Sequence, residues 1–305
     1  MLVSSLDMAH FVARGFLRLD AVVPEEINQA FLHALNLPET VRPESPTAHF
    51  SELLGREVIP EVAPGTRLSQ AYASDSAIGN MLKLPEVAGA IESLVGRDPV
   101  FDHHFLHLAF PEAAFRKHPE RHISQHLHQD STIDPRQTFD IQVFYFPHAV
   151  TAFMGGTRYL PGSHFRIVSE AAISRYQNII GQEHVVCPAG TILLMHMGIW
   201  HGGGVNRSGQ LRTLFKIRLC PAVRQQRLWD CTDLAPEHFT QQPTFWTRGG
   251  QRDPVQKVLM TQEPWFEADT GRLELMNRIR CWRSLLGDPQ FDIDYWLTRV
   301  ENEIS

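Results

Sequence analysis

The stretch Gln125-His-Leu-His-Gln-Asp130 decides how the rest of this chain is interpreted. In an extended strand, side chains alternate between the two faces, so His126, His128 and Asp130 would all project to the same side. An imidazole and a carboxylate two residues apart on one face can bind one metal ion together. The sequence therefore predicts a β-like segment that carries metal ligands.

A distant segment, Ile199-Trp-His201-Gly-Gly-Gly-Val-Asn-Arg-Ser208, supplies a further histidine. His128, Asp130 and His201 would form a triad of two histidines and one carboxylate, the ligand set of non-haem Fe(II) oxygenases, which leaves coordination positions open. The chain has 16 histidines, so a His-x-Asp pair alone is a weak signal. A His126/His128 pair without Asp130 stays open as an alternative.

Two other histidines near these motifs are better explained by structure than by metal binding. His196 ends an apolar run five residues before His201, which favours a core histidine or one that supports a ligand from behind. His164 closes a Pro-Gly-Ser-His turn and is expected to be structural. Trp200 and Tyr145 are expected to line the core or a pocket, because aromatic side chains usually fill space.

The composition describes an ordinary globular protein of 305 residues, with 43% hydrophobic and 20% charged residues. A net charge of −6 with scattered basic residues gives no indication of a nucleic-acid partner. The start lacks the pattern of a signal peptide, and no long apolar run suggests a membrane partner. Four widely spaced cysteines favour reduced thiols, so we expect a soluble cytoplasmic protein.

Strand-like segments dominate the middle of the chain and are separated by Gly, Pro or Asn turns; they are 101–110, 139–146, 157–160, 184–187, 191–196 and 213–219. Helical patterns precede them: a short helix ending at Gly15, a helix following Pro24, and two helices broken at Pro85 and stopped by Gly96. Many short strands with few helices between them predict a mainly β fold with helical additions, built on a sandwich or closed jelly roll.

Three further motifs accompany the triad: Gly155-Gly-Thr-Arg-Tyr-Leu-Pro-Gly-Ser-His164, then Pro188 to Ser208, then Arg212. With the opening Phe11-Val-Ala-Arg-Gly-Phe-Leu-Arg-Leu19, they resemble the phytanoyl-CoA hydroxylase family of Fe(II)- and 2-oxoglutarate-dependent dioxygenases. The likeness covers residues 11–219. It implies a double-stranded β-helix, the jelly roll of the cupins, as the core of the fold.

The resemblance makes His128, Asp130 and His201 the iron ligands and catalytic residues, held on strands. It makes Arg212 the anchor of the 2-oxoglutarate cosubstrate, 11 residues after His201 as in the family, and a guanidinium suits a bidentate carboxylate contact. An ordinary surface ion pair at Arg212 stays open. Gln125 and Thr157 are expected to bind the same cosubstrate. Where relatives often carry serine this chain has Gly203, and Thr213 is a candidate to replace that contact.

The implied activity is hydroxylation of a C–H bond in a small organic molecule, with consumption of O2 and release of succinate and CO2. Related halogenases have a small residue in place of the carboxylate, so Asp130 favours hydroxylation, desaturation or another oxygenase outcome. Two alternatives stay open: a cupin-type metalloenzyme that does not use 2-oxoglutarate, and a catalytically silent binding module. No motif selects a substrate or an oligomeric state.

We expect residues 1–305 to form a single dioxygenase domain. It comprises N-terminal helices over residues 1–100, a jelly-roll core over about residues 100–220, and a C-terminal helical extension over residues 221–305. The extension is rich in aromatic residues, including Trp265, Trp282, Tyr295 and Trp296. The proline-rich segment 38–67 is expected to form loops that cover the site.

Overall fold

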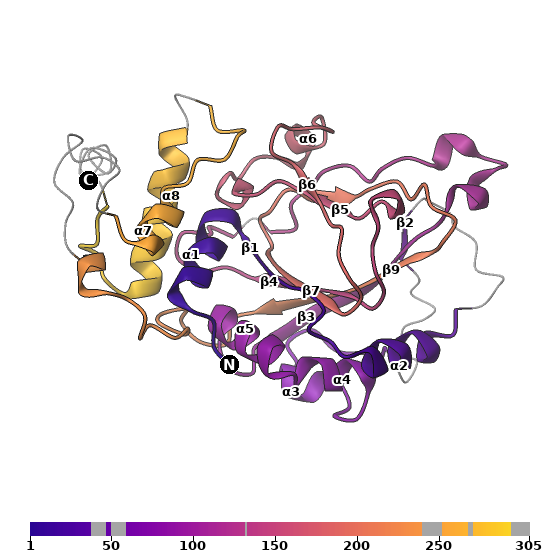
Figure 1. Ribbon diagram of the computed structural model, residues 1–305, viewed down its shortest axis with the longest axis horizontal. Helices are drawn as coiled ribbons and strands as arrows, with labels where there is room; N and C mark the ends of the chain where they lie inside the picture. Colours follow the sequence, from indigo (N-terminus) through magenta and orange to yellow (C-terminus); the bar gives the residue numbers. More distant parts are fainter. Residues whose placement is uncertain (38–46, 50–58, 132, 240–251, 268–270, 294–305) are drawn as a thin grey trace.

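The computed structural model of the protein describes residues 1–37, 47–49, 59–131, 133–239, 252–267 and 271–293. Strands occupy the middle of the chain, and the longer helices precede and follow them (Figure 1). The strands are β1 (Phe16–Leu19), β2 (Thr47–His49), β3 (Val100–Ala109), β4 (Ile141–Phe146), β5 (Thr157–Tyr159), β6 (Glu183–His184), β7 (Thr191–His196), β8 (His201–Gly203) and β9 (Arg212–Cys220). The α-helices are α1 (Ser5–Arg14), α2 (Glu25–Leu35), α3 (Leu68–Ala71), α4 (Ala77–Leu82), α5 (Pro85–Val95), α6 (Glu170–Ile173), α7 (Pro254–Leu259) and α8 (Gly271–Leu286).

Two antiparallel sheets form the core of the fold. Among the described residues, the larger sheet has the strand order β1-β7-β4-β9-β3-β2 and the smaller sheet the order β6-β5-β8. Strand β4 pairs with β7 on one side and with β9 on the other, and β9 pairs along its length with β3. This arrangement confirms the predicted mainly β fold with a jelly-roll core and helical additions.

The alternation of side chains along β4 shows how the larger sheet is buried on both faces. Val143 and Tyr145 belong to the hydrophobic cluster that includes the helices, and the ring of Phe31 in α2 lies 5.2 Å from that of Tyr145. Phe144 and Phe146 belong to a second cluster, which also contains Tyr159 of the smaller sheet. A strand covered on both faces is buried along its whole length rather than at alternate positions, as in Ile141–Phe146, where Gln142 is the one buried residue with a fully polar side chain.

The predicted stops at Gly15 and Gly96 and the predicted break at Pro85 are confirmed. Helix α1 starts with a capping box between Ser4 and Asp7 and stops at Gly15, whose φ of 83° lies in the left-handed region. A side chain at Gly15 would also have no space, because a Cβ there would lie 2.6 Å from Nδ1 of His164. Helix α5 starts at Pro85 and ends before Gly96, which confirms the predicted break and stop.

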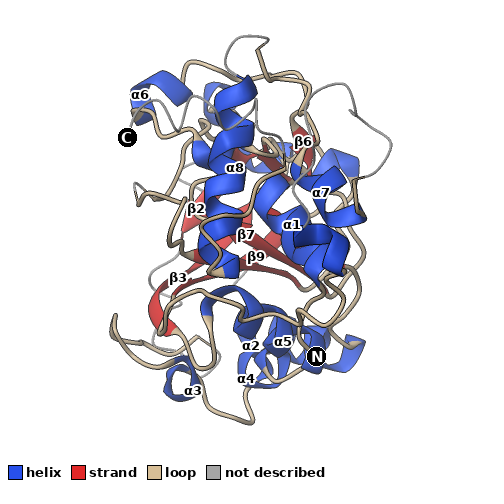
Figure 2. Cartoon of the chain, turned by 90° about the vertical axis from the view of Figure 1, so that its left-hand side faces the viewer, coloured by secondary structure: helices blue, strands red, loops and turns tan. Residues whose placement is uncertain are grey.

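Helices α7 and α8 of the C-terminal extension pack against α1, at the end of the fold away from α2–α5 (Figures 1 and 2). Trp282 of α8 is fully buried, and its indole N–H donates to Nε2 of His238 at 2.9 Å. Its ring also lies against Trp229, with centroids 5.3 Å apart. Tyr295 and Trp296, the other expected aromatic anchors, lie outside the described residues.

The predicted loop cover falls largely on positions 38–46 and 50–58, which also lie outside the described residues. Between them, β2 adds to the edge of the larger sheet by pairing with β3. None of the helices in the described part of the chain is long and apolar enough to cross a membrane.

Candidate metal centre and cosubstrate pocket

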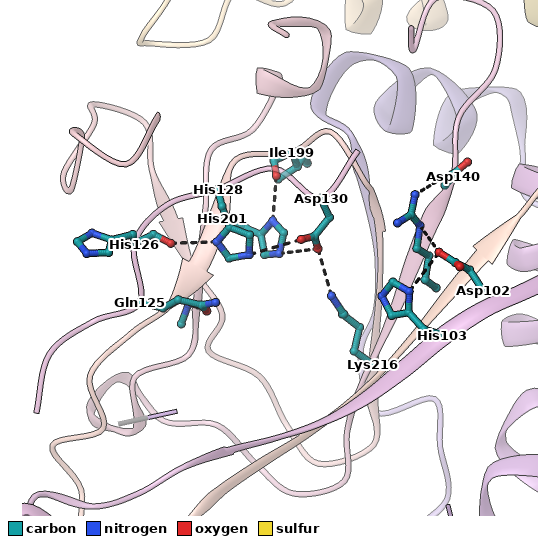
Figure 3. A network of polar contacts seen from close by, with 12 residues as sticks. Asp102, His103, Gln125, His126, His128, Asp130, Asp140, Ile199, His201 and Lys216 are labelled. Atoms are coloured by element: carbon teal, nitrogen blue, oxygen red, sulfur yellow. Dashed lines mark hydrogen bonds and ion pairs between the residues drawn. The ribbon is translucent and has the colours of Figure 1, made fainter. Parts of the chain in front are cut away.

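His128, Asp130 and His201 come together in the structure, with one ligand atom of each within 4.8 Å of the others. The Nε2 atom of His128 lies 3.6 Å from Oδ1 of Asp130, and Nε2 of His201 lies 3.4 Å from Oδ2 (Figure 3). Two ligands about 2.1 Å from a shared ion and at right angles would be about 3 Å apart. The three side chains therefore fit a single metal ion with little movement.

The main chain holds these residues in place. His128 and His201 form an antiparallel bridge, and each N–H donates to the other's carbonyl at 2.9 Å. The N–H of Asp130 donates to the carbonyl of Met197 at 3.0 Å. A metal ion is thus not needed to bring the two segments together.

Both imidazoles have the orientation that metal ligands need. Nδ1 of His128 lies 3.0 Å from the carbonyl of His126, and Nδ1 of His201 lies 2.9 Å from that of Ile199. A carbonyl can only accept, so each Nδ1 carries the proton and each Nε2 presents its lone pair towards Asp130. A hydrogen bond of this kind on the second ring nitrogen is typical of metal-binding histidines.

The protonation states also suit a cation. Burial, followed by repulsion from His201, lowers the pKa of His128 to about 4, so this imidazole is neutral at pH 7. Burial alone would raise the pKa of Asp130. The contacts with His201, Lys216 and His128 outweigh it and hold the pKa of this carboxyl well below its ordinary value.

The prediction that Gln125–Asp130 is a β-like run with three side chains on one face is wrong. Only His128 makes a β-bridge, and the rest of the segment is irregular. His126 is exposed and lies beside Gln177, with Nδ1 3.2 Å from the amide nitrogen, so it stands apart from the cluster. The segment joins β8 at His128 and through the N–H of Gln125, which donates to the carbonyl of Gly203 at 3.0 Å, without forming a continuous ladder.

Arg212 lies at the start of β9 and faces the same hollow as His128 and His201. It is 1% exposed, and its Nε and Nη1 atoms have no hydrogen-bond partner among the described residues. Burial lowers the pKa of Arg212 to about 10, which still leaves the guanidinium charged at pH 7. A buried charge without a partner is costly, so this geometry is suited to an anionic ligand and does not fit a surface ion pair.

Gln125 and Thr157 also line this hollow, together with the apolar side chains of Phe144 and Leu214. Oε1 of Gln125 accepts a hydrogen bond from the N–H of Gly203 at 3.0 Å, so Gln125 supports β8 as well as the pocket. Thr213, the suggested replacement for the missing serine, is on the opposite face of β9 from Arg212 and Leu214 and does not line the hollow. That suggestion is wrong.

His196 and His164 belong to the core, as expected. Both are fully buried beside each other, with ring centroids 4.8 Å apart, and His196 also packs against Phe11 and Phe139. Nδ1 of His196 accepts the N–H of Gly198, and Nε2 of His164 donates to the carbonyl of Val12. These contacts shape the turn that leads into His201.

Sequence reasoning missed Lys216, whose ammonium lies 3.1 Å from Oδ2 of Asp130. The side chain is 6% exposed, and it lines the same hollow as Arg212. The sequence signal that could have placed Lys216 in the hollow was its spacing from Arg212, because residues four apart on a strand share a face. An ion-pair group lies alongside it on the sheet: Arg218 contacts the carboxylates of Asp102 and Asp140 at 3.0 and 2.6 Å.

The residues present fit a divalent metal ion and a dicarboxylate cosubstrate. The donor set of two imidazoles and one carboxylate suits Fe(II), and leaves coordination positions open. The guanidinium of Arg212 lies in the same hollow without a partner in the described parts of the chain, and it suits the far carboxylate of a short dianion.

Solved structures similar to this one share its fold. They include the non-haem α-ketoglutarate-dependent carbocyclase SnoK from nogalamycin biosynthesis, 15% identical with a TM-score of 0.50, covering 74% of this chain and 87% of that one. HygX from Streptomyces hygroscopicus, solved with nickel, 2-oxoglutarate and hygromycin B, is also 15% identical with a TM-score of 0.50, covering 73% of this chain and 89% of that one. AviO1 from Streptomyces viridochromogenes Tue57 has the same identity and TM-score, covering 73% and 97%.

Curated protein sequences give no significant match. The model of one protein family, described as phytanoyl-CoA dioxygenase, matches residues 11–214. This match includes the triad and Arg212 and spans more than half of the 305 residues. The chain therefore belongs to the phytanoyl-CoA dioxygenase (PhyH) family.

Proposed function

We propose that the protein is an Fe(II)- and 2-oxoglutarate-dependent oxygenase that hydroxylates a C–H bond of a small organic molecule and releases succinate and CO2. His128, Asp130 and His201 hold the iron, and Arg212 holds the distal carboxylate of 2-oxoglutarate. The observation that carries the proposal is the buried guanidinium of Arg212, unpartnered among the described residues, in the same hollow as the triad.

The bound iron supplies the activation of O2, coupled to oxidative decarboxylation of 2-oxoglutarate. The chain supplies binding, orientation and exclusion of water. Arg212 offers two parallel N–H donors to a carboxylate, which fixes the direction of the cosubstrate as well as its position. Gln125 and Thr157 offer polar contacts along its length, and Phe144 and Leu214 form apolar walls.

The carboxylate at position 130 supports an oxygenase outcome. In related halogenases a small residue leaves room for halide at this coordination position, whereas here Asp130 fills it. With Asp130 as a ligand a halide would have no such position to bind, so the residues present favour an oxygenase outcome over halogenation. Desaturation would use the same residues.

Formation of succinate tests this function. Purified protein supplied with Fe(II), 2-oxoglutarate and O2 should form succinate slowly without a substrate and faster when a substrate from a panel of small organic molecules is oxidised. Omission of either O2 or Fe(II) should abolish the product. Metal-dependent turnover without succinate would instead support a cupin-type metalloenzyme, and absence of any metal-dependent turnover would support a silent binding module.

A further inference from the structure

The second oxygen of Asp130 has a partner that the metal proposal does not require. Lys216 is on β9, four residues after Arg212, and its neighbours on the sheet are Phe144 in β4 and Phe105 in β3. The Nζ atom lies 3.1 Å from Oδ2 of Asp130 and 5.2 Å from the centre of the Phe105 ring. Figure 3 shows the lysine pointing at the carboxylate from below, while the histidines lie to the left of it.

We propose that Lys216 is a positioning residue that restricts Asp130 to binding the metal through one oxygen; this inference rests on the proposed function. The lysine does not touch the ion or the cosubstrate in this assignment. It acts through Asp130 by occupying Oδ2, which leaves Oδ1 for the metal.

The distances around the carboxylate support this division. Oδ1 lies 3.6 Å from Nε2 of His128, and no cation contacts it among the described residues. Oδ2 lies 3.4 Å from Nε2 of His201 and 3.1 Å from the ammonium. A charged donor at hydrogen-bonding distance is a strong partner for a carboxylate oxygen, so rotation that brings both oxygens to one ion would lose this bond.

Lys216 depends on Asp130 in return. Its side chain is 6% exposed, and Asp130 is the only carboxylate within ion-pair distance of it in the described parts of the chain. The carboxylates of Asp102 and Asp140 are paired with Arg218, two residues further along β9. A buried ammonium without an anion is costly, so Lys216 favours the contact with Asp130 as strongly as Asp130 does.

The restriction has a consequence for the coordination positions. Two histidines and one carboxylate oxygen occupy three positions of an octahedral ion and leave three. A chelating keto acid takes two of these, and O2 needs the third. Carboxylates can also bind metals through both oxygens, and Asp130 in that mode would take one of the three. Lys216 therefore keeps the site open for both cosubstrates.

Two variants separate this role from the positive charge of the lysine. Lys216→Met removes the donor and the charge while keeping the length of the side chain, and Lys216→Gln keeps a neutral donor. Each variant is loaded with Co²⁺ under nitrogen. The visible absorption spectrum and X-ray absorption then report the number of oxygen and nitrogen ligands, and calorimetry reports the affinity for 2-oxoglutarate. Neither readout needs turnover.

In Lys216→Met we expect one additional oxygen ligand from Asp130 and binding of 2-oxoglutarate weakened by about tenfold, the low end for loss of an outer-sphere partner. Lys216→Gln should keep the wild-type spectrum. Phe105→Leu is the matched control, since it removes the ring against Lys216 without touching the Lys216–Asp130 contact, and it should also keep that spectrum.

An unchanged ligand number in a folded Lys216→Met protein overturns the inference. So does a Lys216→Gln protein that behaves like Lys216→Met, because the charge would then matter and not the hydrogen bond. If wild-type protein binds no Co²⁺ through the triad, the proposed function fails first and the inference falls with it. The wild-type measurement thus distinguishes the two failures.

Discussion

His128 and His201, which are 73 positions apart in the sequence, exchange two main-chain hydrogen bonds of 2.9 Å. This bridge joins an irregular segment to the three-residue strand β8 and places both imidazoles on one side. Because backbone groups provide the link, replacing a ligand side chain leaves the link in place. The metal centre can therefore be tested by substitutions that keep the fold.

Asp130→Ala should abolish most metal binding and most activity, because it removes the one anionic ligand of the triad. Loss of an outer-sphere partner alone weakens metal binding by about 10- to 100-fold, so loss of the ligand itself should weaken it by about 100-fold or more. Titration with Mn²⁺ or Co²⁺ measures the change. Full metal affinity and turnover in this variant would refute the assignment of the triad.

His126→Ala is the control for that experiment. His126 is exposed and contacts Gln177 rather than the cluster, so metal affinity should stay within about twofold of wild type, the range of a surface substitution. A large loss of metal in this variant would instead favour the alternative in which His126 and His128 are the ligands.

Arg212→Ala should weaken binding of 2-oxoglutarate without releasing the metal. Removing one partner of a buried charged pair costs about 2 to 5 kcal/mol, equivalent to roughly 30-fold or more in affinity. Arg212→Lys should recover only part of this, because an ammonium cannot offer two parallel donors. Calorimetry with metal-loaded protein measures the affinity of each variant for 2-oxoglutarate. An unchanged requirement for 2-oxoglutarate would support the cupin-type alternative.

The sequence predicts those parts of the fold and site that local residues determine. Proline and glycine at positions 85 and 96 mark a helix start and a helix stop by themselves, and the spacing between His201 and Arg212 carries the family likeness. The strand segments of the larger sheet are also visible in the sequence as short apolar runs between turns. Each of these features depends on residues close together in the chain.

The features that sequence analysis predicted wrongly or missed depend on residues far away in the chain. Whether Gln125–Asp130 becomes a strand is decided by β8, which offers only one bridge to His128. The role of Lys216 depends on a contact with Asp130 across 86 positions. Nothing in the local sequence Lys216-Ile-Arg indicates that contact, because any lysine on a strand beside charged neighbours would look the same.

Stability should fall as the pH is lowered below about 6.5, because several buried histidines, among them His164 and His196, are neutral in the folded state. Burial lowers the pKa of His196 to about 3, and burial followed by the nearby His196 lowers that of His164 well below its ordinary value. Between pH 3 and 6.5 the unfolded chain therefore binds more protons than the folded one. Each such histidine lowers the free energy of unfolding by about 1.4 kcal/mol for each pH unit by which the pH falls in this window. Above pH 7 the effect is absent.

Urea unfolding at pH 5 and at pH 7 checks this prediction, with protein lacking metal at both. His196→Phe is the informative variant, because Phe11 and Phe139 surround the position with aromatic rings. The free energy of unfolding at pH 7 and at pH 5 should differ by about 2 kcal/mol less in this variant than in wild type. This is the contribution of one proton over the roughly 1.5 pH units between 5 and 6.5. A difference as large as in wild type would mean that His196 does not titrate as proposed.

The C-terminal extension contacts the segment that carries His201 through Trp265. Its indole stacks on Trp200, the residue before His201, with ring centroids 6.4 Å and planes 24° apart. The indole N–H donates to the carbonyl of Pro161 at 2.8 Å, and the guanidinium of Arg166 lies over the ring. These contacts join the extension to the turn that carries a ligand, so we propose that residues 1–305 fold as one cooperative unit.

Truncation after Leu219 should consequently give insoluble or loosely folded protein. The truncation exposes the surface of α1 that α7 and α8 cover, and several buried aromatic side chains are lost with them.

Trp282→Ala is a milder test in the full chain: it should lower the free energy of unfolding by about 3 to 5 kcal/mol within a single transition. Thermal melting followed by circular dichroism and by tryptophan fluorescence measures both proteins. A soluble truncation that melts cooperatively and still consumes 2-oxoglutarate normally, or a Trp282→Ala protein with two separate transitions, would show that the extension is an independent appendage.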